Sequence, residues 1–433
     1  MPRPTKEQIR KDIEDAATVN LLVSFIFDSD ESDQPEDPDI LNSEDEFDGE
    51  WQDQDFTVAE LLELSAVNWL AIAEEFNDHD QRGPYNQILR SKDFFSCCLQ
   101  ASDRDFRHMF RMGRDTFDRL VALLAQNPIF TSKGKRPQRH VKFQLGTFLF
   151  RYGSRGSDSL WVAEKLGIGF GTVFKYCRRV CRAIRELRDR FLGWMTPDRR
   201  DTVSAYIQHG YGFRNGVGCG DGSFVPFGDQ PDIIGAAFKS RKKFFGTNVQ
   251  ATCDHEGRIT SYETAWPGSV PDVKIWKNSR IWRKPHDYFR EGEYILVDKG
   301  YPSSPYVLRP FSEPEVAAAS AQDRQRMREF NARISSIRIA SEHTFGRLKG
   351  RFTSLKCMGP HDDLDDLYKA IEALMILHNI CIEWKDKPEY IWSFDPRDNT
   401  PAHFKDDVDP DVIVQVVAGE TEIPALYLMN YSQ

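Results

Sequence analysis

Three carboxylates have surroundings that point to chemistry in this sequence of 433 residues. Asp221 stands between two glycines in GCGDGSFV, whose alternating pattern predicts a strand. Asp298 ends the apolar run YILV, where a lone carboxylate loses several kcal/mol of hydration unless it is paired or bound to a metal. Glu342 is the single acid of the cationic segment SEHTFGRLKGRF. All three are therefore candidate metal ligands.

Each acid also has a structural explanation. Asp221 could be a turn residue in its Asp-Gly step, and Asp298 could cap the following KGYP turn. Glu342 could pair with Arg338, but an i, i+4 pair in this order adds at most a few tenths of a kcal/mol. Gly346, one turn after Glu342, weakens a helix, which suggests that something else fills the space beside the acid.

If the three acids converge, the chemistry they predict is phosphoryl transfer. Two strand-end carboxylates and one on a later helix can hold two divalent ions, and hard oxygen ligands suit Mg²⁺. Two ions about 3.5 to 4 Å apart activate the attacking hydroxyl and stabilise the leaving oxygen. We expect the basic residues of the same helix to hold a nucleic-acid backbone, namely Arg338, Arg347, Lys349 and Arg351.

The elements that must position these acids follow the order of an α/β domain. A strand is predicted around Asp221, and an antiparallel hairpin turns at DHEG between FFGTNVQATC and RITSYETAW. A helix is predicted from about 271 to 282, a doubly buried strand at YILVD and another strand at YVLRPF. A long helix from about 321 to 352 closes the series, with Glu342 at the edge of its apolar stripe, which consists of Phe330, Ile334, Ile337, Phe345, Leu348 and Phe352. Strands followed by alternating helix and strand predict an α/β sheet domain.

A basic helical region precedes the sheet. Residues 159–187 predict two short helices around a Gly-Ile-Gly turn, a spacing typical of a helix-turn-helix. The second helix directs cations outward that could contact phosphates or the major groove, among them Lys175, Arg178, Arg179 and Arg182. A solvated basic face on an antiparallel helix pair explains the same pattern, so both interpretations stay open here.

Charge and cysteine content limit the class of protein. The net charge is −10, but the segment 28–55 holds fourteen acids and no base, so the remainder carries +4. That segment has too few apolar groups to fold, which predicts a disordered arm. The eight cysteines form no C-x-x-C pair, which argues against a zinc finger or a disulfide framework. With neither a signal sequence nor a long apolar run, we expect a soluble, intracellular protein.

Five motifs in order over 216–380 resemble the PIF/Harbinger transposases and their domesticated relatives: GDGSFV, AWPGSVPDVKIWKNS, VDKGYP, FNARISSIRIASEHTFGRLKGRF and LHNI. The resemblance implies a DDE catalytic domain of RNase H-like fold, with the metal-binding triad at Asp221, Asp298 and Glu342. It implies two Mg²⁺ or Mn²⁺ ions, cleavage at transposon ends and joining of the freed 3′-hydroxyl to target DNA. Phe224, where the family often has a His, and Lys299, where a small residue is common, depart from the pattern and put local substrate contacts in doubt.

The resemblance also implies partners and a location. We expect DNA as substrate, a Myb-like protein that assists DNA binding and nuclear entry, and a homo-oligomer without membrane contact. The expected location is the nucleus, or also the cytoplasm if import depends on that partner. A different class remains as the alternative: a catalytically inactive, domesticated DNA-binding or scaffold protein. Asp272 of the WPGSVPD motif matches a capping box with Ser269, and we favour that structural role.

The predicted domains follow from these patterns. They are an acidic, largely disordered arm over 1–56, a helical region over 57–130, a basic helix-turn-helix-like region over 131–200, the RNase H-like DDE nuclease domain over 201–385 and a C-terminal tail over 386–433.

Overall fold

A computed structural model describes residues 65–67, 90–132, 137–156, 158–231, 235–241, 243–359 and 363–396. The predicted acidic arm, the basic residues 133–136 and the C-terminal tail beyond 396 lie outside these residues. Met1–Gln87 and Ile88–Gln433 form separate compact units. The sheet and all the helices from α3 onward belong to the second unit, and the boundaries predicted within it stay predictions.

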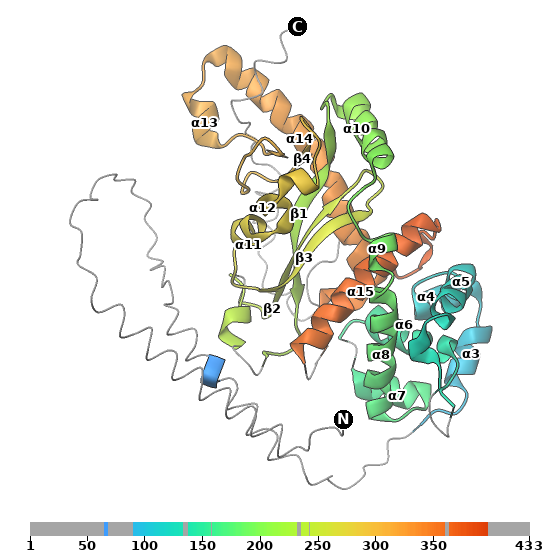
Figure 1. Cartoon of the computed structure of the whole chain (residues 1–433). Helices are drawn as coiled ribbons and strands as arrows, with labels where there is room; N and C mark the ends of the chain where they lie inside the picture. The colour runs from blue at the N-terminus through green and yellow to red at the C-terminus, as the bar shows by residue number, and fades with distance from the viewer. Residues whose placement is uncertain are drawn as a thin grey trace, which may run out of the picture. The chain divides into compact units, whose positions relative to one another are not determined.

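A five-stranded sheet with the order β3-β2-β1-β4-β5 lies at the centre of the second unit (Figure 1). The first three strands along the chain pair antiparallel, and β4 and β5 continue the sheet in parallel from β1. Both the hairpin at DHEG and the buried strand YIL are thereby confirmed. The bounds are β1 (Gly216–Pro226), β2 (Gly246–Cys253), β3 (Ile259–Pro267), β4 (Tyr294–Leu296) and β5 (Val307–Leu308).

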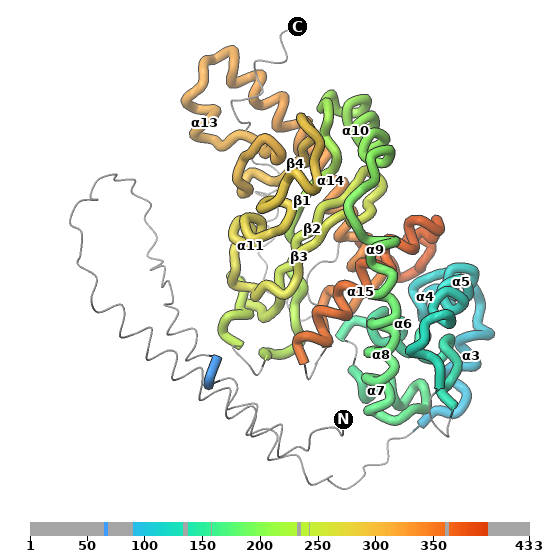
Figure 2. Tube along the Cα trace, in the orientation of Figure 1, coloured from blue at the N-terminus to red at the C-terminus, as the bar shows by residue number. Residues whose placement is uncertain are grey.

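The long helix predicted after the strands is α14 (Ala321–Arg351), which packs across β1, β2 and β4. It starts at Ser320, whose side chain accepts a hydrogen bond from the backbone N–H of Asp323. The predicted stripe is confirmed, because Ile334, Ile337 and Leu348 are almost fully buried. On the other face of β1 lies α11 (Asp272–Asn278), which Figure 2 shows as a separate turn of tube beside the strands. The sheet is therefore covered on both faces.

The helix predicted from about 271 to 282 is broken in two, α11 and α12 (Arg280–Arg283). Ser279 leaves the helical conformation and its hydroxyl accepts the N–H of Trp282, so a second helix begins there.

Helices from the first half of the second unit pack against α15 (Leu364–Glu383) (Figure 1). Their apolar side chains join those of one sheet face in a continuous core.

The two helices predicted around Gly-Ile-Gly are α7 (Ser159–Leu166) and α8 (Phe170–Arg185). Gly167 ends α7 with φ 63°, and a side chain there would lie 2.1 Å from the carbonyl oxygen of Ser91. The bounds are α3 (Phe94–Gln100), α4 (Asp103–Phe110), α5 (Arg114–Ala125), α6 (Val141–Gly153), α7 (Ser159–Leu166), α8 (Phe170–Arg185), α9 (Arg188–Phe191), α10 (Pro197–Tyr211) and α13 (Glu313–Ala318). Across the described ranges, no helix has the length and apolarity needed to span a membrane.

A buried ion pair joins the end of α14 to the helical region. Nη1 of Arg351 lies 3.0 Å from Oδ1 of Asp386, just after α15, and both side chains are 2% exposed. The same Nη1 donates to the carbonyl of Arg111 at 2.7 Å, and Asp386 accepts the N–H of Gly113 at 2.7 Å. Burial alone would raise the pKa of Asp386, but the charge of Arg351 and these hydrogen bonds hold it below its ordinary value.

Loss of this pair should destabilise the fold. We expect Arg351→Met to lower the free energy of unfolding by about 3 to 5 kcal/mol, because it leaves the carboxylate of Asp386 buried without its cation. Denaturant titration of the purified protein measures the effect. The matched control is Arg347→Met, since Arg347 is 44% exposed and pairs with Glu389 at the surface. Equal losses in the two variants would contradict a special role for the buried pair.

Candidate active site

The sheet register places the first two predicted acids side by side. Cys219 of β1 pairs with Leu296 of the parallel neighbour β4. Asp221 lies two residues further along β1, and Asp298 lies two residues beyond the end of β4; both contact Arg338, on the same side of the sheet. Open sheets bind ligands at this carboxyl edge, where β4 has just ended.

The third acid comes to the same place on α14. Ile337 is buried against the sheet, and its carbonyl accepts a weak hydrogen bond from the thiol of Cys219 at 3.7 Å. That contact sets the helix beside β1, immediately before Arg338. Glu342 follows Arg338 by four residues and therefore projects from the same side of the helix, where its side chain is 61% exposed.

Arg338 lies among the three acids. Its Nη1 is 3.0 Å from Oδ1 of Asp298, and its Nη2 is 3.9 Å from Oδ2 of Asp221 and 3.8 Å from Oε1 of Glu342. The predicted pair between Arg338 and Glu342 therefore exists, as one part of a larger arrangement. One guanidinium partly compensates three carboxylates, so the site has an excess of negative charge.

Asp221 is the most desolvated of the three acids. Its side chain is 19% exposed, against 39% for Asp298. Burial raises the pKa of Asp221 to about 6, even though the charge of Arg338 and the N–H of Gly222, which donates to Oδ1 at 2.8 Å, act in the opposite direction. A buried carboxylate with a raised pKa is stabilised more by a nearby cation than an exposed carboxylate is.

The donor set fits hard divalent cations, because it consists of three carboxylates that share one cation and open on one side to solvent. The spacing is a different matter. Within the described ranges, no three Asp, Glu, His or Cys side chains lie close enough to hold one metal ion as they stand. At the triad, the guanidinium of Arg338 stands among the three carboxylates, with its nearest nitrogen 3.0 Å from Oδ1 of Asp298.

The glycines on either side of Asp221 face the opposite side of β1 from its carboxylate. A Cβ at Gly220 would lie 3.5 Å from the ring of Trp276, and one at Gly222 would lie 2.8 Å from Oδ1 of Asp272. Both glycines therefore make room for α11.

Asp272 also differs from its prediction. It begins α11, but no side chain caps that helix, so the capping box with Ser269 is not formed. Its carboxylate instead lies over Gly222, on the far face of the strand from Arg338. Burial and the charge of Asp298 raise the pKa of Asp272. It is an acid close to the triad but not on its side of the sheet.

Tyr301 is a neighbour of the site that was not singled out from the sequence. Its hydroxyl accepts a 2.7 Å hydrogen bond from Nε2 of Gln250, and its ring packs edge-on against Trp276. Burial, followed by the charges of Asp272 and Asp221, raises the pKa of its phenol well above the ordinary value. The sequence feature that could have identified Tyr301 is its position in VDKGYP, three residues after Asp298. The backbone N–H of Tyr301 donates a hydrogen bond to the carbonyl of Asp298.

The space expected beside Gly346 is already filled by the chain. A Cβ at this position would lie 3.0 Å from the carbonyl oxygen of Pro396. The glycine accommodates the segment after α15, so it gives no support for a ligand next to Glu342.

Two of the four predicted DNA contacts on α14 are corrected. Lys349 is 5% exposed and its Nζ donates to the carbonyl of Phe224 at 2.7 Å, while Arg351 forms the buried pair with Asp386. Burial, and then the charge of Lys356, lower the pKa of Lys349 to about 8. The helix turns these two residues toward β1 and the helical region, so neither reaches the surface. Arg347 remains accessible, and Arg338 lies in the site.

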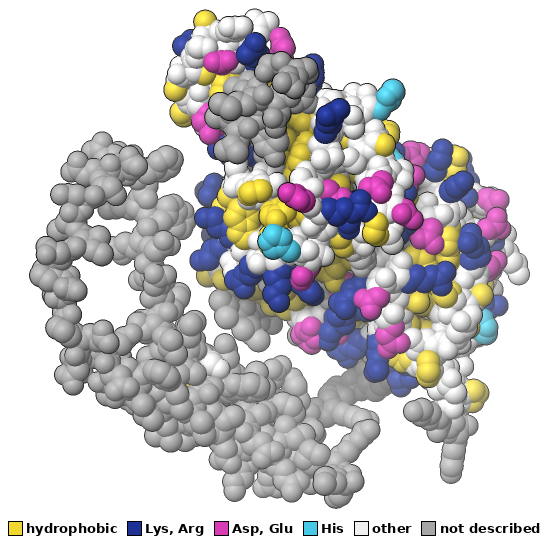
Figure 3. Space-filling model, turned by 45° about the horizontal axis from the view of Figure 1, so that its top comes forward, with side chains coloured by type: hydrophobic (Ala, Val, Ile, Leu, Met, Phe, Trp, Pro, Cys, Tyr) yellow, Lys and Arg dark blue, Asp and Glu magenta, His cyan; other side chains and the backbone are white. Residues whose placement is uncertain are grey.

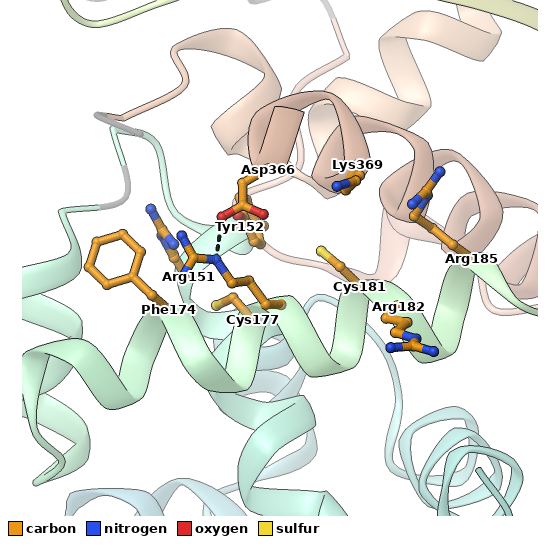
Figure 4. A pocket seen from close by; sticks show the side chains of 10 residues that line it. Arg151, Tyr152, Phe174, Cys177, Cys181, Arg182, Arg185, Asp366 and Lys369 are labelled. Carbon is orange, nitrogen blue, oxygen red and sulfur yellow. Dashed lines mark hydrogen bonds and ion pairs between the residues drawn. The ribbon is translucent and has the colours of Figure 1, made fainter. Parts of the chain in front are cut away.

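The basic face of α8 is partly turned toward α15. Arg178 forms an ion pair with Asp366, and Arg182 pairs with Glu186 of its own helix at 3.2 Å. Lys175 is exposed and Arg179 half-buried. Figure 4 shows Arg182 and Arg185 of α8 at a cavity of about 280 Å³ that Asp366 and Lys369 of α15 also line. The face shown in Figure 3 likewise mixes basic and acidic side chains rather than gathering one sign of charge.

Comparisons with known proteins indicate which family the chain resembles. Residues 221–379 match the model of the DDE superfamily endonucleases, a range that begins at Asp221 and includes Asp298 and Glu342. The chain is 24% identical over 324 residues to "Protein ALP1-like" of Arabidopsis thaliana, covering 70% of this chain and 77% of the relative. It is 24% identical over 293 residues to "Putative nuclease HARBI1" of Homo sapiens, covering 65% and 79%. No solved structure matches the chain significantly.

The raised pKa of Asp221 predicts a pH-dependent stability. The folded protein holds this proton more tightly than the unfolded chain, so the metal-free protein should lose stability as the pH rises from about 4 through about 6. Asp221→Asn removes that loss. We expect it to be more stable than the wild type by about 1 to 3 kcal/mol at pH 7.5 in EDTA, and by much less near pH 4.

Thermal and denaturant unfolding at the two pH values measure this difference. Asp189→Asn is the control, because the side chain of Asp189 is 96% exposed. A variant at Asp221 that is less stable than the wild type at pH 7.5 would show that its carboxylate is not desolvated.

The burial of Lys349 predicts that the basic residues of α14 differ in DNA binding. We expect Arg347→Met to weaken affinity for duplex DNA and to reduce the salt slope by about 1, because it removes one accessible phosphate contact. Lys349→Met should leave both quantities unchanged. Fluorescence anisotropy over a range of salt concentrations tests this, and a larger effect at Lys349 would contradict the assignment.

Proposed function

We propose that this chain, which carries a DDE superfamily endonuclease domain over residues 221–379, cuts DNA phosphodiester bonds with two divalent cations held by Asp221, Asp298 and Glu342. The observation that carries the proposal is the convergence of these three acids on the single guanidinium of Arg338. Three carboxylates around one cation form an oxygen-rich site of excess negative charge, which is what a pair of Mg²⁺ or Mn²⁺ ions requires.

The three acids would divide the work according to their exposure. Asp221 is fixed within β1 and the most buried, so it would form the rigid floor of the site. Asp298 and Glu342 are more exposed and line the side from which a DNA backbone can approach. Bound divalent ions would supply a lowered pKa for the attacking hydroxyl and charge stabilisation for the leaving oxygen.

Accessible basic side chains would hold the DNA substrate. Arg347 lies little more than one turn beyond Glu342 and is 44% exposed, so it can contact a phosphate near the site. Lys175, Arg179 and, after release from their acidic partners, Arg178 and Arg182 would extend DNA contact along α8. The helix-turn-helix-like role of α7 and α8 is part of this proposal.

More specifically, we propose that the chain is a transposase. An RNase H-like fold, joining of the freed 3′-hydroxyl to target DNA, recognition of transposon ends and a homo-oligomeric state are proposed from the resemblance to the PIF/Harbinger family. A Myb-like partner and a nuclear location, with cytoplasmic protein if import needs that partner, belong to the same proposal. The human relative's name supports nuclease chemistry in particular.

A nicking assay tests the proposed reaction. We expect the full chain to convert supercoiled plasmid to nicked or linear DNA with Mg²⁺ or Mn²⁺, and not with EDTA. Asp298→Asn and Glu342→Gln should reduce cleavage to background, because each removes a charged metal ligand. The exposed variant Asp189→Asn serves as the control, with unchanged cleavage expected.

Two results would count against the proposal. Cleavage that persists in the variants of Asp221, Asp298 and Glu342 would show that the triad is misassigned. A folded wild-type protein that binds DNA but never cleaves it would favour the non-catalytic alternative.

A further inference from the structure

We infer that Arg338 is a resident cation that holds the three carboxylates together and is exchanged for divalent metal when the site becomes active. The inference rests on the proposed function, since it concerns the same acids. It assigns to Arg338 the part of a positioning residue, in place of a simple contact to DNA.

Arg338 lies among the three acids. Its side chain is 17% exposed, and its two terminal nitrogens lie within 3.9 Å of an oxygen of each acid. It therefore occupies volume among the carboxylate oxygens that would hold a metal ion. Two cations cannot share that volume without repelling one another, so metal binding and the present position of Arg338 exclude each other.

The contacts of Arg338 are loosely fitted. Its shortest contact to an acid is the one to Asp298, at 3.0 Å, and its buried Nε has no hydrogen-bond partner among the described residues. Elsewhere in the chain, Arg309 binds Glu315 through both terminal nitrogens, at 3.1 and 2.9 Å. Arg338 is thus held mainly by charge and not by a fitted fork, which suits a group that has to leave.

The helix need not move for this exchange. Ile334 and Ile337, in the turn before Arg338, are buried, and the contact from the thiol of Cys219 to the carbonyl of Ile337 fixes the backbone next to Arg338. Exchange would be a rotation of one long side chain toward solvent. The freed guanidinium would stay beside the site with all its donors available to a DNA phosphate.

Metal affinity measures this exchange without any activity assay. We compare full-length wild type with Arg338→Met, titrating Mn²⁺ and following free Mn²⁺ by electron paramagnetic resonance. The variant should bind Mn²⁺ about tenfold more tightly or better, because the metal no longer competes with an internal cation. Its metal-free form should melt at a lower temperature, and the rise in melting temperature on adding Mn²⁺ should exceed that of the wild type.

Two further variants make the result specific. Arg338→Lys restores a positive charge and should bring the affinity back toward the wild-type value. Arg333→Met is the matched control, an exposed arginine on the same helix, and should bind Mn²⁺ like the wild type. If Arg338→Met does not fold, the wild type still tests the exchange. The guanidinium NMR signal of Arg338 is identified as the one missing from the spectrum of Arg338→Lys, and adding Mg²⁺ to the wild type should shift it.

The outcomes separate the inference from the proposed function. Equal Mn²⁺ affinity in wild type and Arg338→Met, with binding lost in Asp298→Asn, overturns the exchange and leaves the metal site standing. No Mn²⁺ binding in any folded variant overturns both. A guanidinium signal that does not respond to a saturating metal concentration also overturns the exchange.

Discussion

The need of three neighbouring carboxylates for a cation is the constraint on which the centre of this structure depends. Asp221 and Asp298 are brought close together by the parallel pairing of β1 with β4, which ends two residues before each acid. Glu342 adds a third negative charge from α14, and the same helix supplies Arg338 one turn earlier. The pairing of β1 with β4, the crossing of α14 and the contact from Cys219 all serve to place that guanidinium. A fold that concentrates acids in this way must carry a positive charge at their centre in every state.

The same helix separates structural from functional charge. Lys349 and Arg351 point into the protein, where one ties α14 to β1 and the other neutralises Asp386 beneath the helical region. Arg347 and Glu342 point outward. Under the proposed function, this cationic helix has two roles: one face attaches it to the sheet and the helical region, and the other face contacts the ligand. The ligand-facing side also requires that Asp221 be desolvated, and this burial raises its pKa to about 6.

The sequence predicts the elements and the acids better than it predicts what packs between them. Alternation, apolar runs and the 3.6-residue stripe locate the five strands and α14 because these patterns report which side of an element is buried. They do not report the partner. Gly220 and Gly222 face Trp276 and Asp272, and Gly346 meets Pro396, a residue fifty positions away. The sequence likewise groups Arg351 with the predicted DNA contacts, because it does not show that the segment after α15 covers the side to which Arg351 turns. Such contacts depend on tertiary packing, and local sequence carries no record of it.

Under the proposed function, side chains of the protein stand in for ligands at two places: carboxylates take the place of DNA phosphates on α8, and an arginine takes the place of a metal ion at the triad. On α8, Asp366 and Glu186 neutralise two of the arginines that a nucleic acid would otherwise contact. In the triad, the relation is reversed, and an arginine stands where a cation from solution would bind. Each arrangement keeps unlike charges paired while the ligand is absent, and each requires an exchange before the ligand can be held. Binding then depends on the difference between two sets of pairs, so DNA and metal affinity should both be modest at each contact and gain strength only when several exchanges occur together.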